Sequence, residues 1–436
     1  MGSIWKSQIE MPEFQSVEGN KKTDVLIIGG GMAGILCAYF LQKAGVDYML
    51  VEKDRICAGV TKNTTAKITA QHRLIYRKLM KKAGEEKARL YFEANQDAVN
   101  TYFELCKGIQ CDLERKTAFV YSVDDRKKLE EEADALSRIG VNKIGVNTRF
   151  TEKTELPFQI AGAIGLENQA QFHPLKFVSE IAKGLRIYEN TFVKEFAEQK
   201  AVTEKGDIIF QKAIITTHFP IDNKHGMYFL KMYQDRSYVI ALEYAKQMKG
   251  MYIDEAKTGK SFRSYRDLLL VGGGSHRTGK DGGKWDELRE FARNYYPDAK
   301  ERFSWATQDC MTLDEIPYIG TYSKRLGYCY VATGFNKWGM TSSMAAAKVL
   351  TDLVLEKENM YAEIFSPSRS IWTPQLAVNS FEAAKGLVTL SPKRCPHMGC
   401  ALKWNPTERT WDCPCHGSRF DEEGKVKDNP ANGNLE

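Results

Sequence analysis

The sequence predicts an α/β nucleotide-binding domain with an interleaved α+β domain, followed by a small β-rich module that binds metal. Two observations lead to this prediction. A glycine-rich turn lies between an apolar segment and a helical pattern near the N-terminus, and four cysteines and two histidines lie close together between Cys395 and His416. The chain has 436 residues, which is enough for two or three domains with hydrophobic cores of their own.

The N-terminal pattern is that of a dinucleotide-binding βαβ unit. Residues 24–28 predict a buried strand, the glycines of 29–34 follow it, and an apolar helical pattern continues to residue 45. A second strand is expected over 47–51. A membrane span over 25–41 is the alternative, but three consecutive glycines in the middle of the run argue against it.

Each residue type in this turn has a physical role. Gly29 is expected to make the tight turn, Gly31 to let the backbone approach a pyrophosphate, and Gly34 to allow close packing of helix and strand. Glu52 ends the second strand and can reach the ribose hydroxyls, while the helix N-terminus attracts the phosphates. Further cofactor contacts are expected next to these residues, at Met32, Ala33 and Lys53.

The C-terminal motif pairs Cys-x-His with Cys-x-x-His. Cys395 and His397 form the first pair, and Cys413 and His416 form the second. This arrangement lets two thiolates hold one iron of a [2Fe–2S] cluster and two imidazoles hold the other. A small structural zinc module is the alternative, although zinc ligands usually follow Cys-x2–4-Cys and His-x3–5-His spacings.

These residues resemble the cluster-binding motif of Rieske proteins. In Rieske proteins of respiratory complexes a disulfide joins the tips of the two ligand loops, and the resemblance implies such a bond between Cys400 and Cys415. The Ser418 hydroxyl can donate a hydrogen bond to cluster sulfur and raise the potential. High-potential relatives usually have tyrosine where this chain has Phe420, which implies a lower potential. The module is also shorter than a full Rieske domain, which has several strands before its first ligand loop.

Composition is typical of a soluble enzyme. The net charge of +6 is spread over runs of mixed sign, such as 127–132, which indicates solvated helix faces rather than a nucleic-acid surface. We expect no secretory signal, no membrane-spanning segment and no binding to nucleic acid. Six further cysteines are scattered along the chain, as is usual for buried thiols of a cytoplasmic protein.

The middle of the chain alternates between helical and strand patterns. Residues 72–138 are predicted to be mainly helical, and short strands are expected over 191–196 and 207–216. The alternation over 221–272 favours an antiparallel sheet that covers a ligand. A hydrophilic, proline-containing stretch over 366–385 is typical of a connection between domains.

Over about residues 20–355 the chain resembles the D-amino-acid oxidase and glycine oxidase family of FAD enzymes. Besides the glycine turn, the resemblance rests on the segments 59–67, 312–320 and 332–341. In that family the last segment opens a helix whose N-terminus faces the flavin pyrimidine edge, so the resemblance implies FAD rather than NAD. It implies further flavin contacts at Thr61, Thr65, Ala66, Lys67, Val193, Thr217, Gly334, Phe335, Trp338, Gly339, Met340 and Thr341.

The whole chain resembles bacterial oxidoreductases in which a glycine-oxidase-like flavin domain is fused to a C-terminal Rieske module. We therefore expect an N-terminal arm, an FAD-dependent oxidoreductase domain, a linker and a Rieske module. Their predicted ranges are 1–20, 21–355, 356–385 and 386–436. Within the second, the FAD-binding parts are about 21–75, 150–220 and 300–355, and the substrate-domain parts are about 76–149 and 221–299.

The favoured function is oxidation of an amine or amino-acid C–N bond by hydride transfer to flavin, followed by one-electron transfer through the cluster to a redox partner. Arg263 could pair with a substrate carboxylate, while His173 and Lys67 could face the flavin. A structural or solvated role is the alternative for each. The alternatives for the whole chain are an oxygen-using oxidase with a structural Rieske module, and an electron-transfer protein without a small organic substrate.

Overall fold

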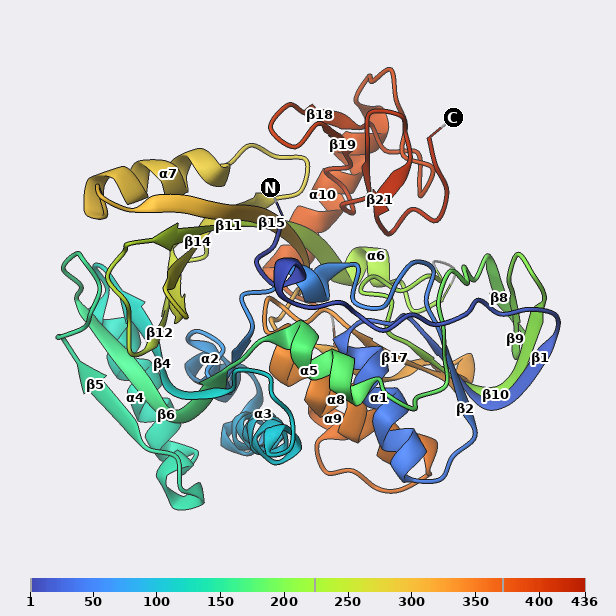
Figure 1. Ribbon diagram of the computed structural model, residues 1–436, viewed down its shortest axis with the longest axis horizontal. Helices are drawn as coiled ribbons and strands as arrows, with labels where there is room; N and C mark the ends of the chain where they lie inside the picture. Colours follow the sequence, from blue (N-terminus) through green and yellow to red (C-terminus); the bar gives the residue numbers. More distant parts are fainter. Residues whose placement is uncertain (1, 223–224, 371, 436) are drawn as a thin grey trace.

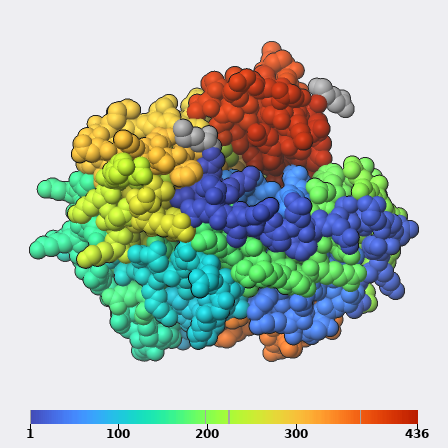
Figure 2. All heavy atoms as spheres, viewed as in Figure 1, coloured from blue at the N-terminus to red at the C-terminus, as the bar shows by residue number. Residues whose placement is uncertain are grey.

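The computed structural model describes residues 2–222, 225–370 and 372–435. This part of the chain forms two large sheets, with helices packed around them, and one small sheet (Figure 1). The small sheet and its loops, residues 389–435, are called the C-terminal module. The module protrudes as a lobe from one side of the molecule (Figure 2).

The first large sheet is the nucleotide-binding sheet that the sequence predicted. Its strand β1 runs parallel to both β2 and β10. Alternate residues of β1 enter different cores, with Val25 and Ile27 on the side of the helices α1 and α8 and Leu26 and Ile28 on the other side. A strand covered on both faces has to be continuously apolar, which explains the run of 25–28. The described strands of this sheet are β1 (Lys21–Ile28), β2 (Tyr48–Val51), β7 (Ile187–Tyr188), β8 (Glu195–Ala197), β9 (Lys200–Val202), β10 (Asp207–Ile215), β16 (Tyr318–Ser323) and β17 (Leu326–Thr333).

The second large sheet is mainly antiparallel, as expected from the alternation over 221–272. In its centre β11 pairs with β14 on one side and β15 on the other. The described strands are β3 (Lys67–Ile68), β4 (Glu114–Ser122), β5 (Thr148–Thr151), β6 (Gly162–Gln171), β11 (Met232–Glu243), β12 (Met251–Asp254), β13 (Ser261–Tyr265), β14 (Leu268–Arg277) and β15 (Lys300–Thr312). The module contributes β18 (Lys403–Asn405), β19 (Thr410–Asp412), β20 (Arg419–Phe420) and β21 (Val426–Asp428).

The helical prediction over 72–138 is confirmed for three helices but missed a strand. Strand β4 lies within this range because Ala118 to Ser122 are buried and pair with β6. The strand expected over 191–196 begins only at Glu195. The helices of the described residues are α1 (Met32–Lys43), α2 (Ile75–Ala83), α3 (Glu85–Cys106), α4 (Arg126–Arg138), α5 (Pro174–Ile181), α6 (Tyr228–Lys231), α7 (Lys284–Tyr295), α8 (Gly339–Val354), α9 (Ala362–Phe365) and α10 (Pro374–Val388), with short 3-10 helices at Lys6–Gln8, Val60–Asn63 and Val141–Ile144. Within the described ranges, none of them has the length and apolar character needed to cross a membrane.

The connection to the module is more ordered than the sequence predicted. Helix α10 occupies much of the stretch expected to be a linker, and it begins with Pro374 at its first turn. Proline is tolerated there because that position needs no hydrogen-bond donor. Near its other end, the Gly386 carbonyl accepts a hydrogen bond of 2.9 Å from the Ala401 amide. A side chain at Gly386 would lie 2.1 Å from Cys415 Sγ, so the helix packs directly against the ligand loops.

Candidate functional site

Residues of both large sheets and of the C-terminal module line one cavity of about 1070 Å³. It is large enough for a dinucleotide and a small substrate. Its wall contains the predicted cofactor contacts except Gly34, Ala66 and Thr341. The module contributes residues from Asp421 to Asn434, including Asp428 and Asn429.

The glycine turn has the geometry that the sequence predicted. Gly29 has a φ of +111°, and a side chain there would lie 2.8 Å from the Thr216 carbonyl oxygen. A side chain at Gly34 would lie 1.9 Å from the Gly29 carbonyl, so helix α1 could not pack this closely with any larger residue. At Gly31 the nearest atom would be Thr61 Oγ1 at 3.5 Å, so this position borders open cavity. These contacts fit a bound pyrophosphate at the helix N-terminus.

Glu52 also fits its predicted place. Its carboxylate accepts hydrogen bonds from the Gly30 amide at 2.7 Å and from the Asp54 amide at 3.0 Å. Burial raises its pKa, against the opposing effect of these two amides. The side chain both fixes the turn and borders the cavity, where its free lone pairs can accept from ribose hydroxyls.

Lys67 lies in the cavity wall, as predicted. Burial and the positive charge of Arg263 lower its pKa to about 7. Nearby, His72 stacks on Trp338 with ring centroids 4.7 Å apart and lies 3.1 Å from Thr341 Oγ1. These contacts hold the start of α8, which carries the predicted flavin-edge segment.

Arg263 and His173 lie together, but neither is in the cavity wall. Arg263 donates hydrogen bonds to the Thr65 and Ala66 carbonyls, and its guanidinium lies 5.5 Å from the ring of Trp5. His173 accepts from the Lys176 amide at the start of α5, and its ring lies 5.1 Å from that of Trp5. The buried Trp5 thus packs against both residues. Because neither lines the cavity, the predicted contact of Arg263 with substrate and the predicted position of His173 facing the flavin stay predictions.

The cavity wall also contains charged residues that were not predicted from the sequence, among them Arg73, Asp309 and Lys337. Arg73 has a φ of +56°, and its side chain has no hydrogen bond or ion pair with any described residue. Burial raises the pKa of Asp309 to about 6, although Lys337 opposes this effect. No motif surrounds Arg73 or Asp309 in the sequence, whereas Lys337 lies within the segment 332–341. Strand pairing places Asp309 opposite Asp235, and the Asp235 carboxylate lies 3.3 Å from the Lys337 ammonium group. The two aspartates and the lysine therefore come together only in the folded protein.

The two ligand loops of the module have the same backbone design. In the first, the Gly399 amide donates to the Cys395 carbonyl at 2.8 Å, and in the second the Gly417 amide donates to the Cys413 carbonyl at 2.9 Å. Both glycines have a positive φ, of +75° and +89°. Each loop thus folds back on its cysteine and brings the histidine of the motif to the same side.

The four predicted ligands gather at these loops. Cys395, Cys413 and His416 are buried, and the rings of His397 and His416 lie 5.0 Å apart. Both ring nitrogens of His397 and Nδ1 of His416 are buried without a hydrogen-bond partner among the described residues. Burial lowers the pKa of His397 to about 3 and that of His416 to about 4, so both rings are neutral. Neutral imidazoles with unused nitrogen atoms fit the two-histidine iron of a Rieske cluster.

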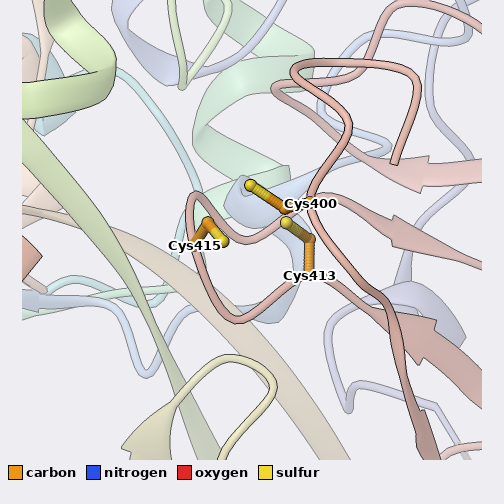
Figure 3. A group of neighbouring side chains, drawn as sticks. All are labelled: Cys400, Cys413 and Cys415. Carbon is orange, nitrogen blue, oxygen red and sulfur yellow. The ribbon is translucent and has the colours of Figure 1, made fainter. Parts of the chain in front are cut away.

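Three sulfur atoms converge between the loops (Figure 3). The Sγ atoms of Cys400, Cys413 and Cys415 lie within 4.8 Å of one another. All three cysteines are free thiols in the structure, so the predicted bond between Cys400 and Cys415 is not formed, although the two residues are neighbours. The disulfide remains a prediction.

The histidine side of the module faces the large sheets. The ring of Phe219 lies 6.2 Å from that of His397, and the ring of Phe229 lies 5.8 Å from that of His416. Asn429 of the module donates hydrogen bonds of 2.8 and 2.9 Å to the carbonyls of Thr217 and Phe219. These contacts hold the ligand loops next to the segment that follows strand β10.

A buried ion-pair network forms a second attachment. Glu408 of the module pairs with Arg236 of β11 and with Arg419 of β20. Arg419 also pairs with Asp412 and Asp428, at 3.0 and 2.9 Å. Although burial opposes ionisation, Arg236 and Arg419 lower the pKa of Glu408 to about 2.

We expect Arg419→Met to destabilise the module by about 3–5 kcal/mol, because it leaves three carboxylates without their shared cation. Urea unfolding of the holoprotein measures the change. The exposed pair of Arg409 with Glu422 provides the control, since Arg409→Met should cost less than about 1 kcal/mol. The pKa of Glu408 is lowered on folding, so its contribution is present above its ordinary pKa of 4.5 and is lost as the pH falls towards 2. Equal losses of stability in Arg419→Met and Arg409→Met would contradict a stabilising role of the ion-pair network.

Comparison with protein families assigns both parts of the chain. Residues 24–353 match the family model "FAD dependent oxidoreductase", and residues 364–436 match the model "Rieske [2Fe-2S] domain". The chain is 35% identical over 494 residues to YhfW of Bacillus subtilis, described as a Rieske 2Fe-2S iron-sulfur protein, with 98% of this chain and 96% of that protein covered. It is 47% identical over 51 residues to cytochrome b6-f complex iron-sulfur subunit 2 of Trichormus variabilis, which corresponds to 11% of this chain and 29% of that protein.

Solved structures show a similar fold. L-proline dehydrogenase from P. horikoshii has a TM-score of 0.67 at 18% identity, covering 80% of this chain and 98% of that chain. Glycine oxidase from Geobacillus kaustophilus has a TM-score of 0.65 at 22% identity, covering 81% of this chain and 100% of that chain. At these identities the likeness concerns the fold alone.

Proposed function

The chain belongs to the FAD-dependent oxidoreductase family and ends in a Rieske [2Fe-2S] domain, and from this we propose that it is an amine or amino-acid dehydrogenase with an internal one-electron outlet. FAD accepts two electrons from an organic substrate, and a [2Fe–2S] cluster takes up one at a time. The residues of the chain would bind and orient the two groups, and the contact between the two sites supports electron transfer between them.

One observation carries the proposal. The consecutive residues Thr217, His218 and Phe219 connect the two sites: the first two line the cavity and the third contacts the ring of His397. The imidazole side of the module therefore lies against the segment that lines the flavin cavity. If the module had only a structural role, its ligand histidines would not need to lie at this contact.

The cavity wall supports a small zwitterionic or cationic substrate. One face of the second sheet leaves space because small residues border the cavity, namely Ser237, Ser261, Gly272, Gly273, Ser275 and Thr307. Arg73 offers a guanidinium that has no hydrogen-bond or ion-pair partner among the described residues, which suits a carboxylate. Asp309, with its pKa raised to about 6, can bind an ammonium group and accept its proton. Several proteins of similar fold are enzymes named for amino acids, namely L-proline dehydrogenase, L-amino acid deaminase and glycine oxidase, and this agrees with the choice.

An anaerobic absorbance screen tests the proposal. The holoprotein is mixed with a panel of primary and secondary amino acids and with the corresponding amines that lack the carboxylate, and flavin bleaching is followed. We expect at least one amino acid to bleach the flavin. Arg73→Gln should raise its apparent KM about 10- to 100-fold while the corresponding amine is little affected, because a charged hydrogen bond of about 1.5–3 kcal/mol is lost.

Arg266→Gln is the matched control for this screen, since Arg266 is exposed and pairs with Asp112 at 3.3 Å. A holoprotein whose flavin no amine or amino acid reduces would favour an electron-transfer protein without an organic substrate. An unchanged KM in Arg73→Gln would remove Arg73 from the substrate site.

A further inference from the structure

Arg277, at the end of strand β14, lies against the second ligand loop of the C-terminal module. Its Nη2 donates to the Cys415 carbonyl at 3.0 Å and its Nε to the Pro414 carbonyl at 3.3 Å. Both carbonyls lie between the predicted ligands Cys413 and His416. The second large sheet therefore places a guanidinium beside the cluster site of the module.

The positive charge of Arg277 has no counter-ion within ion-pair distance among the described residues. Its other close contacts are neutral as well: Nη1 donates to Asn379 Oδ1 at 2.9 Å, and the guanidinium lies 5.1 Å from the ring of Tyr233. The acids nearby are engaged elsewhere. Asp235, opposite Arg277 on β11, pairs with Lys337 at 3.3 Å, and Glu382 pairs with Lys280 at 2.7 Å.

The position of this charge has a simple electrostatic consequence. The guanidinium is hydrogen-bonded to the backbone of the second ligand loop, so its positive charge stabilises any negative charge that the loop and its bound group carry.

We infer that Arg277 raises the reduction potential of the cluster from outside the module, by placing an uncompensated positive charge beside the loop that holds Cys413 and His416. Reduction of the cluster adds one electron and one negative charge, which a nearby cation stabilises. This charge opposes the loss of potential expected from Phe420. The inference rests on the proposed cluster, but it concerns the potential of that cluster and not the substrate.

The test is a redox titration of the full-length holoprotein in which the EPR signal of the reduced cluster is followed. Arg277→Gln should lower the equilibrium constant for reduction of the cluster about tenfold, which is about 59 mV for one electron. Arg277→Lys keeps the charge but not the planar pair of donors, so its potential should stay near that of the unaltered protein. Lys403→Gln removes a cation from the exposed pair of Lys403 with Asp281 and should leave the potential unchanged.

Asn379→Asp provides an independent variant if Arg277→Gln fails to assemble the cluster. It places a carboxylate on Nη1 of Arg277 and compensates the charge without removing the guanidinium, so the potential should again fall. Equal potentials in Asn379→Asp, Arg277→Lys and the unaltered protein would overturn the inference. So would equal decreases in Arg277→Gln and Arg277→Lys, because these would assign the effect to hydrogen bonding alone.

The outcomes separate this inference from the proposed function. One possible result is that the cluster potential of the Arg277 and Asn379 variants equals that of the unaltered protein while an amino acid still reduces the flavin. That result would overturn the role of Arg277 and would still support the proposed dehydrogenase. Potentials that shift as expected, in a protein that no amine or amino acid reduces, would support Arg277 and overturn the proposed substrate class.

Discussion

Replacing His416 with alanine is expected to abolish the EPR signal of the [2Fe–2S] cluster while FAD stays bound. The substitution removes one of the two imidazoles that are predicted to hold the same iron. His416 does not border the flavin cavity, so the direct flavin contacts are unchanged. EPR after dithionite reduction and flavin absorbance after denaturation measure the two cofactors separately.

Cys400→Ser is the matched control, because Cys400 lies in the other ligand loop but is not a predicted ligand. We expect it to weaken the cluster without abolishing the signal. If Cys400→Ser proved as damaging as His416→Ala, the ligand assignment would have to be revised. Iron retained at full stoichiometry in His416→Ala would point to a different set of iron ligands, and zinc in place of iron in the unaltered protein would favour the zinc module considered from the sequence.

Replacing Gly31 with leucine should remove FAD and leave a folded protein that retains its cluster. The protein itself tolerates a side chain here, because the nearest atom to an added Cβ is Thr61 Oγ1 at 3.5 Å. The bulk would instead occupy the cavity where the pyrophosphate approaches the helix. An overlap that costs about 3 kcal/mol lowers the affinity for FAD more than about 100-fold. Flavin content per protein after gel filtration measures the effect.

Two other glycines make this prediction specific. Gly108→Leu should leave flavin content unchanged, since an added Cβ there has no atom within 4 Å. Gly34→Ala should instead impair folding, because its Cβ would lie 1.9 Å from the Gly29 carbonyl. A Gly31→Leu protein with full flavin content would contradict the assigned pyrophosphate site.

Local motifs accounted for both cofactor sites. The glycine turn could be predicted because its roles depend on a few neighbouring residues: Gly29 needs a positive φ, and Gly34 needs the absence of a side chain. The cluster ligands could be predicted for the same reason, since each Cys–His pair lies within a single loop. Within each motif, the residues that determine the local geometry are close together in the sequence.

The residues around these motifs depend on contacts that no short pattern contains. Arg263 was expected to meet substrate, but it lies outside the cavity wall, where Trp5, more than 250 positions earlier, packs against it. Arg73 reaches the cavity only through a left-handed backbone conformation, which is uncommon for arginine. Helix α10 was missed because Pro374 suggested a linker, whereas a proline in the first turn of a helix is compatible with it.

The orientation of the module depends on the longest-range contacts of all. Phe219 and His397 are brought together by the fold, and neither residue alone indicates that His397 lies against the segment that lines the flavin cavity. The division of the chain into separate domains remains a prediction. The module and both large sheets line the same cavity, so this site does not belong to one segment of the sequence.

The central claim is that electrons pass from the flavin to the cluster within one molecule. Anaerobic stopped-flow spectroscopy tests it most directly: the flavin is reduced by a substrate from the screen or by light, and the flavin and cluster bands are followed together. We predict that the cluster is reduced with the flavin at a rate independent of protein concentration, and faster than the reduced flavin reacts with dissolved oxygen. A cluster that stays oxidised, or that lags the flavin by minutes, would contradict the account and favour an oxygen-using oxidase with a structural module.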